Sequence, residues 1–161
     1  MSTLDTDFLI PEFQQFPKIP RFSREIIITE KIDGTNAQIF ITEDLKMFAG
    51  SRNRWLTLED DNYGFAAWVN SNYVELLKLG PGRHFGEWWG KGIQRNYSQT
   101  EKKFSLFNVK RWSGTNTHPS CCSVVPILFQ GPLEEHLVLK GMQDALYRLK
   151  NEGSLDRKSV V

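Results

Sequence analysis

A lysine between an apolar strand and a turn is the residue best placed for chemistry. Segment 29–36 reads Thr-Glu-Lys-Ile-Asp-Gly-Thr-Asn and puts Lys31 shortly after the run Ile26 to Ile28. Such a lysine usually lays its aliphatic stem over apolar surface and keeps its ammonium in water. The alternative role is a nucleophilic amine, whose pKa must be lowered by partial burial or by nearby positive charge. Lys31 is therefore the candidate nucleophile.

A second candidate is Arg52, which follows Ser51 at the expected end of a strand. Arginine offers phosphate a rigid fork of donors, and phosphoryl transfer needs positive groups to gather the phosphates. Arg54 lies close in sequence, so a solvated surface pair is the alternative.

Glu87 is a third candidate, because it interrupts an aromatic strand. A carboxylate in such a strand needs polar partners. Hydroxyl groups of a bound ligand are one choice, and an ion pair with Arg83 or Lys91 is the other. Trp88 and Trp89 follow Glu87 in this strand, and their side chains point to opposite faces. At most one of them lines a pocket, and the other belongs to the core.

The order of these segments resembles that of the covalent nucleotidyltransferases, the superfamily of polynucleotide ligases and mRNA capping enzymes. Segment 30–36 resembles the motif that carries the nucleotide on its lysine, and it is most similar to ATP-dependent RNA ligases of the bacteriophage RNA ligase 2 group. Segments 51–53, 85–90 and 104–112 resemble the next three motifs in the family's order, so the similarity covers roughly residues 20–132.

The resemblance implies an enzyme that forms a lysyl-AMP intermediate from ATP with Mg²⁺ or Mn²⁺ and seals 5′-phosphate and 3′-hydroxyl RNA ends. It implies that Lys31 is catalytic, that Arg52 contacts the nucleotide or the RNA end, and that Glu87 holds the ribose. It leaves the metal ligands unassigned. The residues that it implies for nucleotide binding are Glu30, Ile32, Asp33, Gly34, Asn36, Arg52, Glu87 and Phe107.

Some of these residues have simpler alternative roles. Asp33 is an orienting or metal-side group by resemblance, but it also suits a turn, as does Asn36. Phe104 and Phe107 lie on opposite faces of a predicted strand, so only one ring can reach a base. The motif selects Phe107, and a core position is the alternative.

The elements that must position these residues form an α+β pattern of antiparallel sheets flanked by helices. A hairpin is predicted with strands at 26–28 and 37–41 and a tight turn at Asp33-Gly34, which places Lys31 near a sheet rim. By resemblance, the fold is a nucleotidyltransferase (ATP-grasp-like) domain. Further strands are predicted at 83–89, 103–112 and 123–130, with helices at 63–79 and 133–150, the second with apolar Leu137, Leu139, Met142, Ala145, Leu146 and Leu149.

Two strands expected by resemblance, with the patterns Glu-Gly-x-Val and Lys-x-Lys, do not follow the last predicted helix. We expect residues 1–155 to be a partial adenylyltransferase domain that is incomplete at its C-terminus. Residues 156–161 resemble one translated frame of a sequencing adapter, so we interpret them as a non-native tail.

Composition agrees with one folded domain: 40% of the 161 residues are hydrophobic and 12% are aromatic. The net charge of +1 gives no global signal for nucleic acid, so RNA contacts must come from local clusters. No apolar run suits a membrane or a secretory signal, and the adjacent Cys121 and Cys122 suit neither a disulfide framework nor a metal site. We expect a cytoplasmic protein with no membrane partner.

Two classes of function remain. The first is the RNA-joining enzyme, with mRNA capping and DNA ligation as variants of the same chemistry. The second is a truncated or degenerate domain that binds nucleotide or RNA without catalysis.

Overall fold

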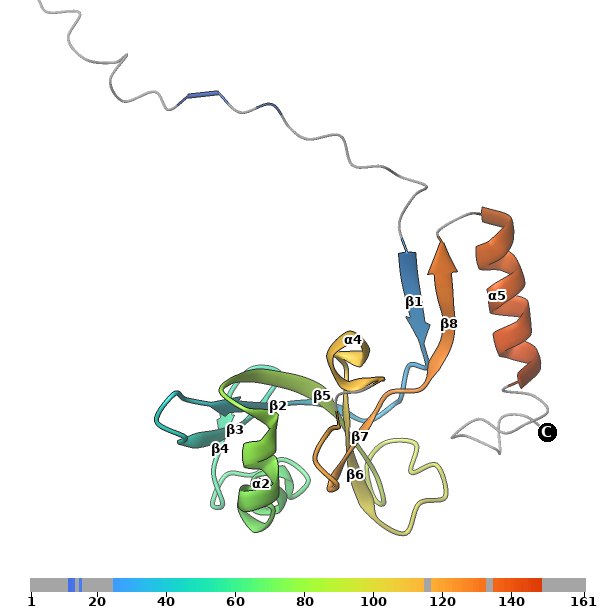
Figure 1. Ribbon diagram of the computed structural model, residues 1–161. Helices are drawn as coiled ribbons and strands as arrows, with labels where there is room; N and C mark the ends of the chain where they lie inside the picture. The colour runs from blue at the N-terminus through green and yellow to red at the C-terminus, as the bar shows by residue number, and fades with distance from the viewer. Residues whose placement is uncertain (1–11, 14, 16–24, 115–116, 133–134, 149–161) are drawn as a thin grey trace, which may run out of the picture.

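The computed structural model describes residues 12–13, 15, 25–114, 117–132 and 135–148. A larger and a smaller β-sheet lie side by side, with one long helix next to the smaller sheet (Figure 1). The elements are β1 (Glu25–Thr29), β2 (Thr35–Ile41), β3 (Met47–Ser51), β4 (Trp55–Leu56), α2 (Phe65–Ser71), α3 (Tyr73–Leu76), the 3₁₀ helix η1 (Leu77–Leu79), β5 (Gly82–Gly90), β6 (Lys102–Leu106), α4 (Val109–Trp112), β7 (Cys122–Val124), β8 (Ile127–Pro132) and α5 (Glu135–Arg148).

The larger sheet has six strands in the order β4-β3-β2-β5-β6-β7. In β2 the residues Ala37, Ile39 and Ile41 alternate with polar or half-buried ones, so one face of the strand is apolar. Helix α2 adds Phe65 and Val69 to the main core on this face. Burial of this face holds the helical segment against the sheet.

The opposite face of the larger sheet is open over much of its area. Asn36 and Gln38 lie on this face because they alternate with the core residues of β2. Near β5 and β6 a second apolar cluster covers the face, and it contains Ile32, Trp89, Tyr97, Val109 and Val125. Functional side chains on the open face therefore border this second cluster.

The smaller sheet corrects the predicted hairpin. Strand β1 pairs antiparallel with β8, and β2 pairs with β3 and β5, so the strands around Lys31 belong to different sheets. Asp33 and Gly34 form no tight hairpin turn. The Asp33 amide instead donates to the Tyr97 hydroxyl, and the Gly34 amide donates to Glu87 of β5. Lys31 thus lies in the segment that connects the smaller sheet to the larger one.

The predicted strand 103–112 is also corrected, because it ends at Leu106 and is followed by the short helix α4. The Asn108 side chain accepts a hydrogen bond from the Arg111 amide at 3.1 Å, which caps the helix. Local capping therefore overrides the alternating pattern that predicted a longer strand.

The predicted strand 123–130 is two strands, β7 and β8, separated at Val125-Pro126. Proline has no amide hydrogen for a strand ladder, and the Pro126 carbonyl instead accepts a bond from the Glu30 amide at 2.9 Å. Strand β7 pairs parallel with β6, so the expectation of purely antiparallel sheets is wrong for this edge.

The helix predicted at 63–79 is broken into α2, α3 and η1. Asn72 leaves helical geometry at the break, and its side chain donates to the Trp68 carbonyl at 2.8 Å. Side-chain bonds of this kind compete with the helix backbone, which explains the break. The predicted end at Gly80 is confirmed.

The second predicted helix is confirmed as α5, but most of its described apolar residues are exposed. Ala145 is buried, whereas Leu139, Met142 and Leu146 are exposed. Leu137 and Leu149 lie outside the residues whose side chains the structure describes. Helix α5 contacts β8, where Gly141 lies against the Phe129 ring.

In the described part of the chain, no helix has the length and apolar character that a membrane crossing requires.

Candidate functional site

The Lys31 segment, residues 30–34, connects the two sheets. Ile32 is buried in the second apolar cluster, while Lys31 and Asp33 on either side of it are exposed. The apolar side chain anchors the segment, and its burial leaves the neighbouring charged side chains in solvent. Lys31 is exposed rather than partly buried, so the expected desolvation of its amine is not seen among the described residues.

Three hydrogen bonds fix the backbone of the Lys31 segment. The Glu30 amide donates to the Pro126 carbonyl at 2.9 Å, and the Asp33 amide donates to the Tyr97 hydroxyl at 2.6 Å. The Gly34 amide donates to Oε1 of Glu87 at 3.0 Å. The segment is therefore held from both sheets, and Lys31 is presented from a fixed backbone.

Gly34 makes the closest approach of this segment to β5. A Cβ atom at this position would lie 2.4 Å from the Trp88 carbonyl oxygen and 2.7 Å from the Trp89 Cβ. Only glycine fits at this spacing without a shift of the backbone. The glycine of the motif is thus required by packing rather than by a tight turn.

Glu87 lies beside Asn36, its register partner on β2, and is 8% exposed. Burial raises the pKa of the Glu87 carboxyl, and the negative charge of Asp33 adds to this effect. The Gly34 amide, Lys31 and Arg52 oppose it by favouring the charged form. These charges act on one carboxylate, so Lys31, Asp33, Arg52 and Glu87 share one electrostatic environment.

The alternative partners expected for Glu87 are not observed. In the described region no ion pair joins Glu87 to Arg83 or Lys91, and Arg83 instead lies over the Phe40 ring at 4.5 Å from its centroid. Apart from the Gly34 amide, the carboxylate has capacity for a further polar partner.

A cavity of about 190 Å³ opens on the sheet next to this carboxylate region. It brings together three of the predicted residues, Asn36, Arg52 and Phe107. The remaining predicted residues, Lys31 and Glu87 among them, do not line it. The lining residues are Asn36, Ala37, Gln38, Ser51, Arg52, Phe85 and Phe107. A planar ring next to amide and guanidinium groups suits a ligand with an aromatic base and an anionic group.

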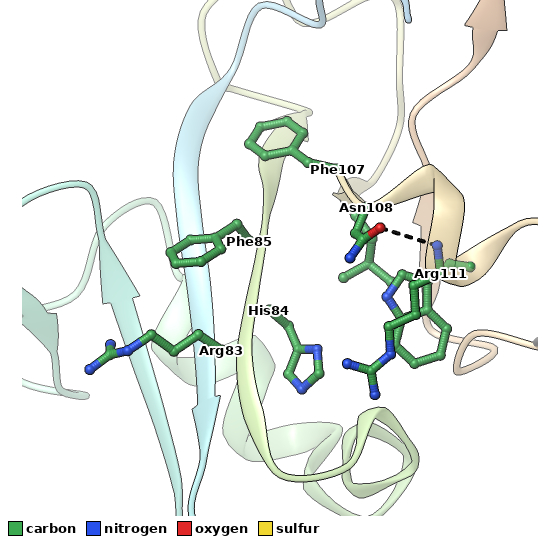
Figure 2. A pocket seen from close by; sticks show the side chains of 8 residues that line it. Arg83, His84, Phe85, Phe107, Asn108 and Arg111 are labelled. Carbon is green, nitrogen blue, oxygen red and sulfur yellow. Dashed lines mark hydrogen bonds between the residues drawn. The ribbon is translucent and has the colours of Figure 1, made fainter. Parts of the chain in front are cut away.

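A second cavity of about 210 Å³ adjoins the first and shares Phe85 and Phe107 with it. Figure 2 shows Phe85 and Arg83 on one side of β5 and His84 on the other, facing Arg111. His84 Nε2 lies 2.8 Å from the Gly80 carbonyl, and burial lowers the pKa of the imidazole. This contact joins His84 of β5 to the residue that ends η1.

Phe104 and Phe107, the two candidates for a ring that stacks on a base, lie in different surroundings. Phe104 is fully buried in the main core, whereas Phe107 follows β6 and is 40% exposed in the cavity wall. Of Trp88 and Trp89, at most one was predicted to line a pocket, and the structure buries both. Phe85, at 52% exposed, takes that place instead and was missed.

Tyr97 is the other residue that sequence reasoning missed. It is buried, its ring packs edge-on against Trp89 at 5.5 Å, and its hydroxyl holds the Asp33 amide. Burial also raises the pKa of its hydroxyl. Gln94, Asn96, Tyr97 and Ser98 all have positive φ, a conformation that costs about 1 kcal/mol for a non-glycine residue. No periodic pattern marks such a loop.

Potential metal ligands do not gather in the part of the chain that the structure describes. Within ranges 25–114, 117–132 and 135–148, no three His, Cys, Asp or Glu side chains are placed to hold a metal ion. Mg²⁺ is often held by one or two carboxylates together with substrate phosphates, so the Mg²⁺ or Mn²⁺ that the resemblance implies stays a prediction.

Comparison with known proteins gives both a family and a fold. Residues 24–157 match the family model described as RNA ligase. A Naegleria gruberi RNA ligase structure with PPi has a TM-score of 0.57 and 22% identity over 71% of this chain. Mutants of that ligase with ATP and Mn and with AMP and Mn give TM-scores of 0.56 and 0.54 at 23% and 21% identity. The chain spans 39% of the length of these solved chains.

The close approach of Gly34 predicts a cost for any added side chain. Gly34→Ala should lower the free energy of unfolding by about 1–3 kcal/mol, because the new Cβ overlaps the Trp88 carbonyl. Denaturant unfolding measures this loss. Gly92→Ala is the control, since a Cβ at this position would meet nothing within 4 Å. Its expected loss of about 1 kcal/mol comes only from placing alanine in a left-handed backbone conformation. Equal losses in both variants would contradict the packing argument.

The Tyr97 hydroxyl should contribute to the order of the Lys31 segment. Tyr97→Phe leaves the Asp33 amide without its acceptor, so we expect a loss of about 1–2 kcal/mol and faster hydrogen exchange at Asp33. Tyr73→Phe is the matched control, because its hydroxyl bonds the exposed Leu45 carbonyl far from this segment. Unchanged exchange at Asp33 in Tyr97→Phe would refute the role.

The raised pKa of Glu87 predicts a pH-dependent stability. A carboxyl with a raised folded pKa stabilises the protein below its unfolded pKa, and this contribution is lost as the pH rises through the folded pKa. Glu87→Gln should therefore raise the free energy of unfolding at pH 7, with the gain absent below about pH 4. Glu59→Gln, at an exposed site, is the control. Destabilisation by Glu87→Gln at pH 7 would contradict the prediction.

Proposed function

The chain belongs to the RNA ligase family, and we propose that it acts as an ATP-dependent nucleotidyltransferase that forms a covalent lysyl-AMP and seals 5′-phosphate and 3′-hydroxyl RNA ends. The observation that carries this proposal is the Lys31 segment, which is pinned to Glu87 next to a cavity lined by Arg52 and Phe107. An amine carried by a fixed backbone near a site for an aromatic, anionic ligand is the arrangement that such chemistry needs.

In the first step the Lys31 amine attacks the α-phosphorus of ATP. A bond forms between Nζ and phosphorus, the bond to the bridging oxygen breaks, and pyrophosphate leaves with that electron pair. The amine must lose a proton, which passes to solvent because Lys31 is exposed. Positioning and charge neutralisation supply most of the rate enhancement in such transfers.

The surrounding residues have separate tasks in this proposal. Arg52 contacts the phosphates with its guanidinium fork, and Phe107 stacks on the adenine in the cavity wall. Glu87 accepts from the ribose hydroxyls while it holds Gly34, and Asn36 lies opposite it on β2. Glu30, Ile32 and Asp33 act through the backbone that presents Lys31.

In the later steps an RNA 5′-phosphate oxygen attacks the lysyl-AMP phosphorus and displaces the lysine. The 3′-hydroxyl of the other end then attacks the activated 5′-phosphate and releases AMP. RNA is thus the proposed partner.

A domain that binds nucleotide or RNA without catalysis is the second candidate. It is favoured by the exposure of Lys31, because a nucleophilic amine is usually activated by partial burial. DNA ligation or mRNA capping would use the same Lys31 chemistry with another substrate.

Covalent labelling with α-labelled ATP separates these candidates. We expect the chain to take label that is stable to denaturation, and Lys31→Ala to reduce it to background. Lys46→Ala is the matched control, because this exposed lysine pairs with Asp44 beyond the far end of β2. No label on wild type would favour the binding-only domain, and label on Lys31→Ala would refute the assigned nucleophile.

A further inference from the structure

Three aromatic rings form a cluster on the open face of the larger sheet, beyond the nucleotide cavity. Phe40 and Phe48 are register partners on β2 and β3, with ring centroids 6.4 Å apart. Trp55 of β4 lies 6.2 Å from Phe40 and 5.9 Å from Phe48. The Trp55 ring also covers Gly50, where a Cβ would lie only 3.1 Å from it. Glycine here lets the indole rest on the sheet.

Arg83 adds a positive charge to this cluster. It is the register partner of Phe40 on β5, and its Cζ lies 4.5 Å from the Phe40 centroid and 5.5 Å from the Trp55 centroid. Its Nη1 donates to Oε1 of Gln38 at 3.3 Å. A guanidinium over aromatic rings is held in place while its remaining donors face outward.

Two of the three rings are exposed although they pack together, and Phe40 is half-buried. Phe48 is 44% exposed and Trp55 is 47% exposed. Phe85 and Phe107, in the walls of the two cavities, continue the aromatic surface toward β6. An exposed aromatic surface of this kind indicates an interaction site rather than a core.

We propose that this aromatic platform, formed by Phe40, Phe48, Trp55 and Arg83, binds a single-stranded segment of the RNA substrate by base stacking. The proposal rests on the proposed function and adds to it a surface outside the nucleotide cavity. The four strand spacings from β4 to β6 give a width of about 19 Å. This width suits about four nucleotides that continue toward Phe85 and Phe107.

The charges of the platform favour RNA over an apolar partner. On the described open face of β2 to β5, Glu87 is the one acidic residue, and it lies at the Lys31 end. Bases stack on the rings, while phosphates attract Arg83 and the nearby Arg52. An apolar protein surface would instead bury the Arg83 charge without a counter-ion, which is costly.

The test is fluorescence anisotropy with a labelled oligoadenylate of about eight nucleotides. Trp55→Ala and Phe48→Ala should each weaken binding at least about fivefold, because each removes one stacking ring. Trp55→Phe should restore most of the affinity, since it keeps a ring. Phe13→Ala is the control, because Phe13 is 88% exposed outside both sheets and should not change binding. Thermal melts confirm that the variants remain folded.

Several outcomes would overturn the platform. These are no binding by wild type, equal affinity in wild type and both alanine variants, or a loss of the same size in Phe13→Ala. Self-association that is lost in Trp55→Ala without any change in RNA affinity would identify a protein interface instead.

Labelling of wild type with ATP is measured separately. If the chain binds RNA through the rings but takes no label, only the proposed chemistry is refuted. If the chain takes label but its RNA affinity is unchanged in the ring variants, only the platform is refuted.

Discussion

The Gly34 amide and the Glu87 carboxylate share a hydrogen bond, and the geometry of the candidate site depends on it. The bond joins the crossing segment that carries Lys31 to the central strand β5, and it requires Gly34 to lie against the Trp88 carbonyl. A buried carboxylate is costly unless it has polar partners, so Glu87 and the segment constrain each other. Packing of Ile32 and the Tyr97 hydroxyl strengthens the same arrangement.

The open sheet face divides into regions with different chemistry. Near Lys31 it is charged and close to the second apolar cluster, in its middle it carries the cavity with Asn36 and Arg52, and beyond that it is aromatic. This order follows from strand alternation, because the core residues of β2 fix which side chains face outward. One strand therefore positions residues for the proposed nucleotide contact and for the aromatic surface together.

The sequence predicts the positions of several strands better than it predicts the topology, and the roles assigned to the site residues stay predictions. Motif order identifies the Lys31, Arg52 and Glu87 segments, and alternation identifies β2 and β5 correctly. The hairpin around Lys31 is wrong because strand pairing between β1 and β8 joins residues distant in sequence, which local turn chemistry does not reveal. Tyr97 was missed because its loop has positive φ values and no periodic pattern. Strand 103–112 was too long because Asn108 caps a helix.

The pairing of β1 with β8 has a consequence for folding. Glu25 is the register partner of Pro132, so the smaller sheet closes a loop that contains the entire larger sheet. Closing so long a loop costs chain entropy before any contact repays it, and contacts of this range slow folding. During synthesis the strand before Lys31, β1, has no partner strand until β8, which ends at residue 132, has been made. We therefore expect the surroundings of Lys31, the proposed nucleophile, to be completed late in folding.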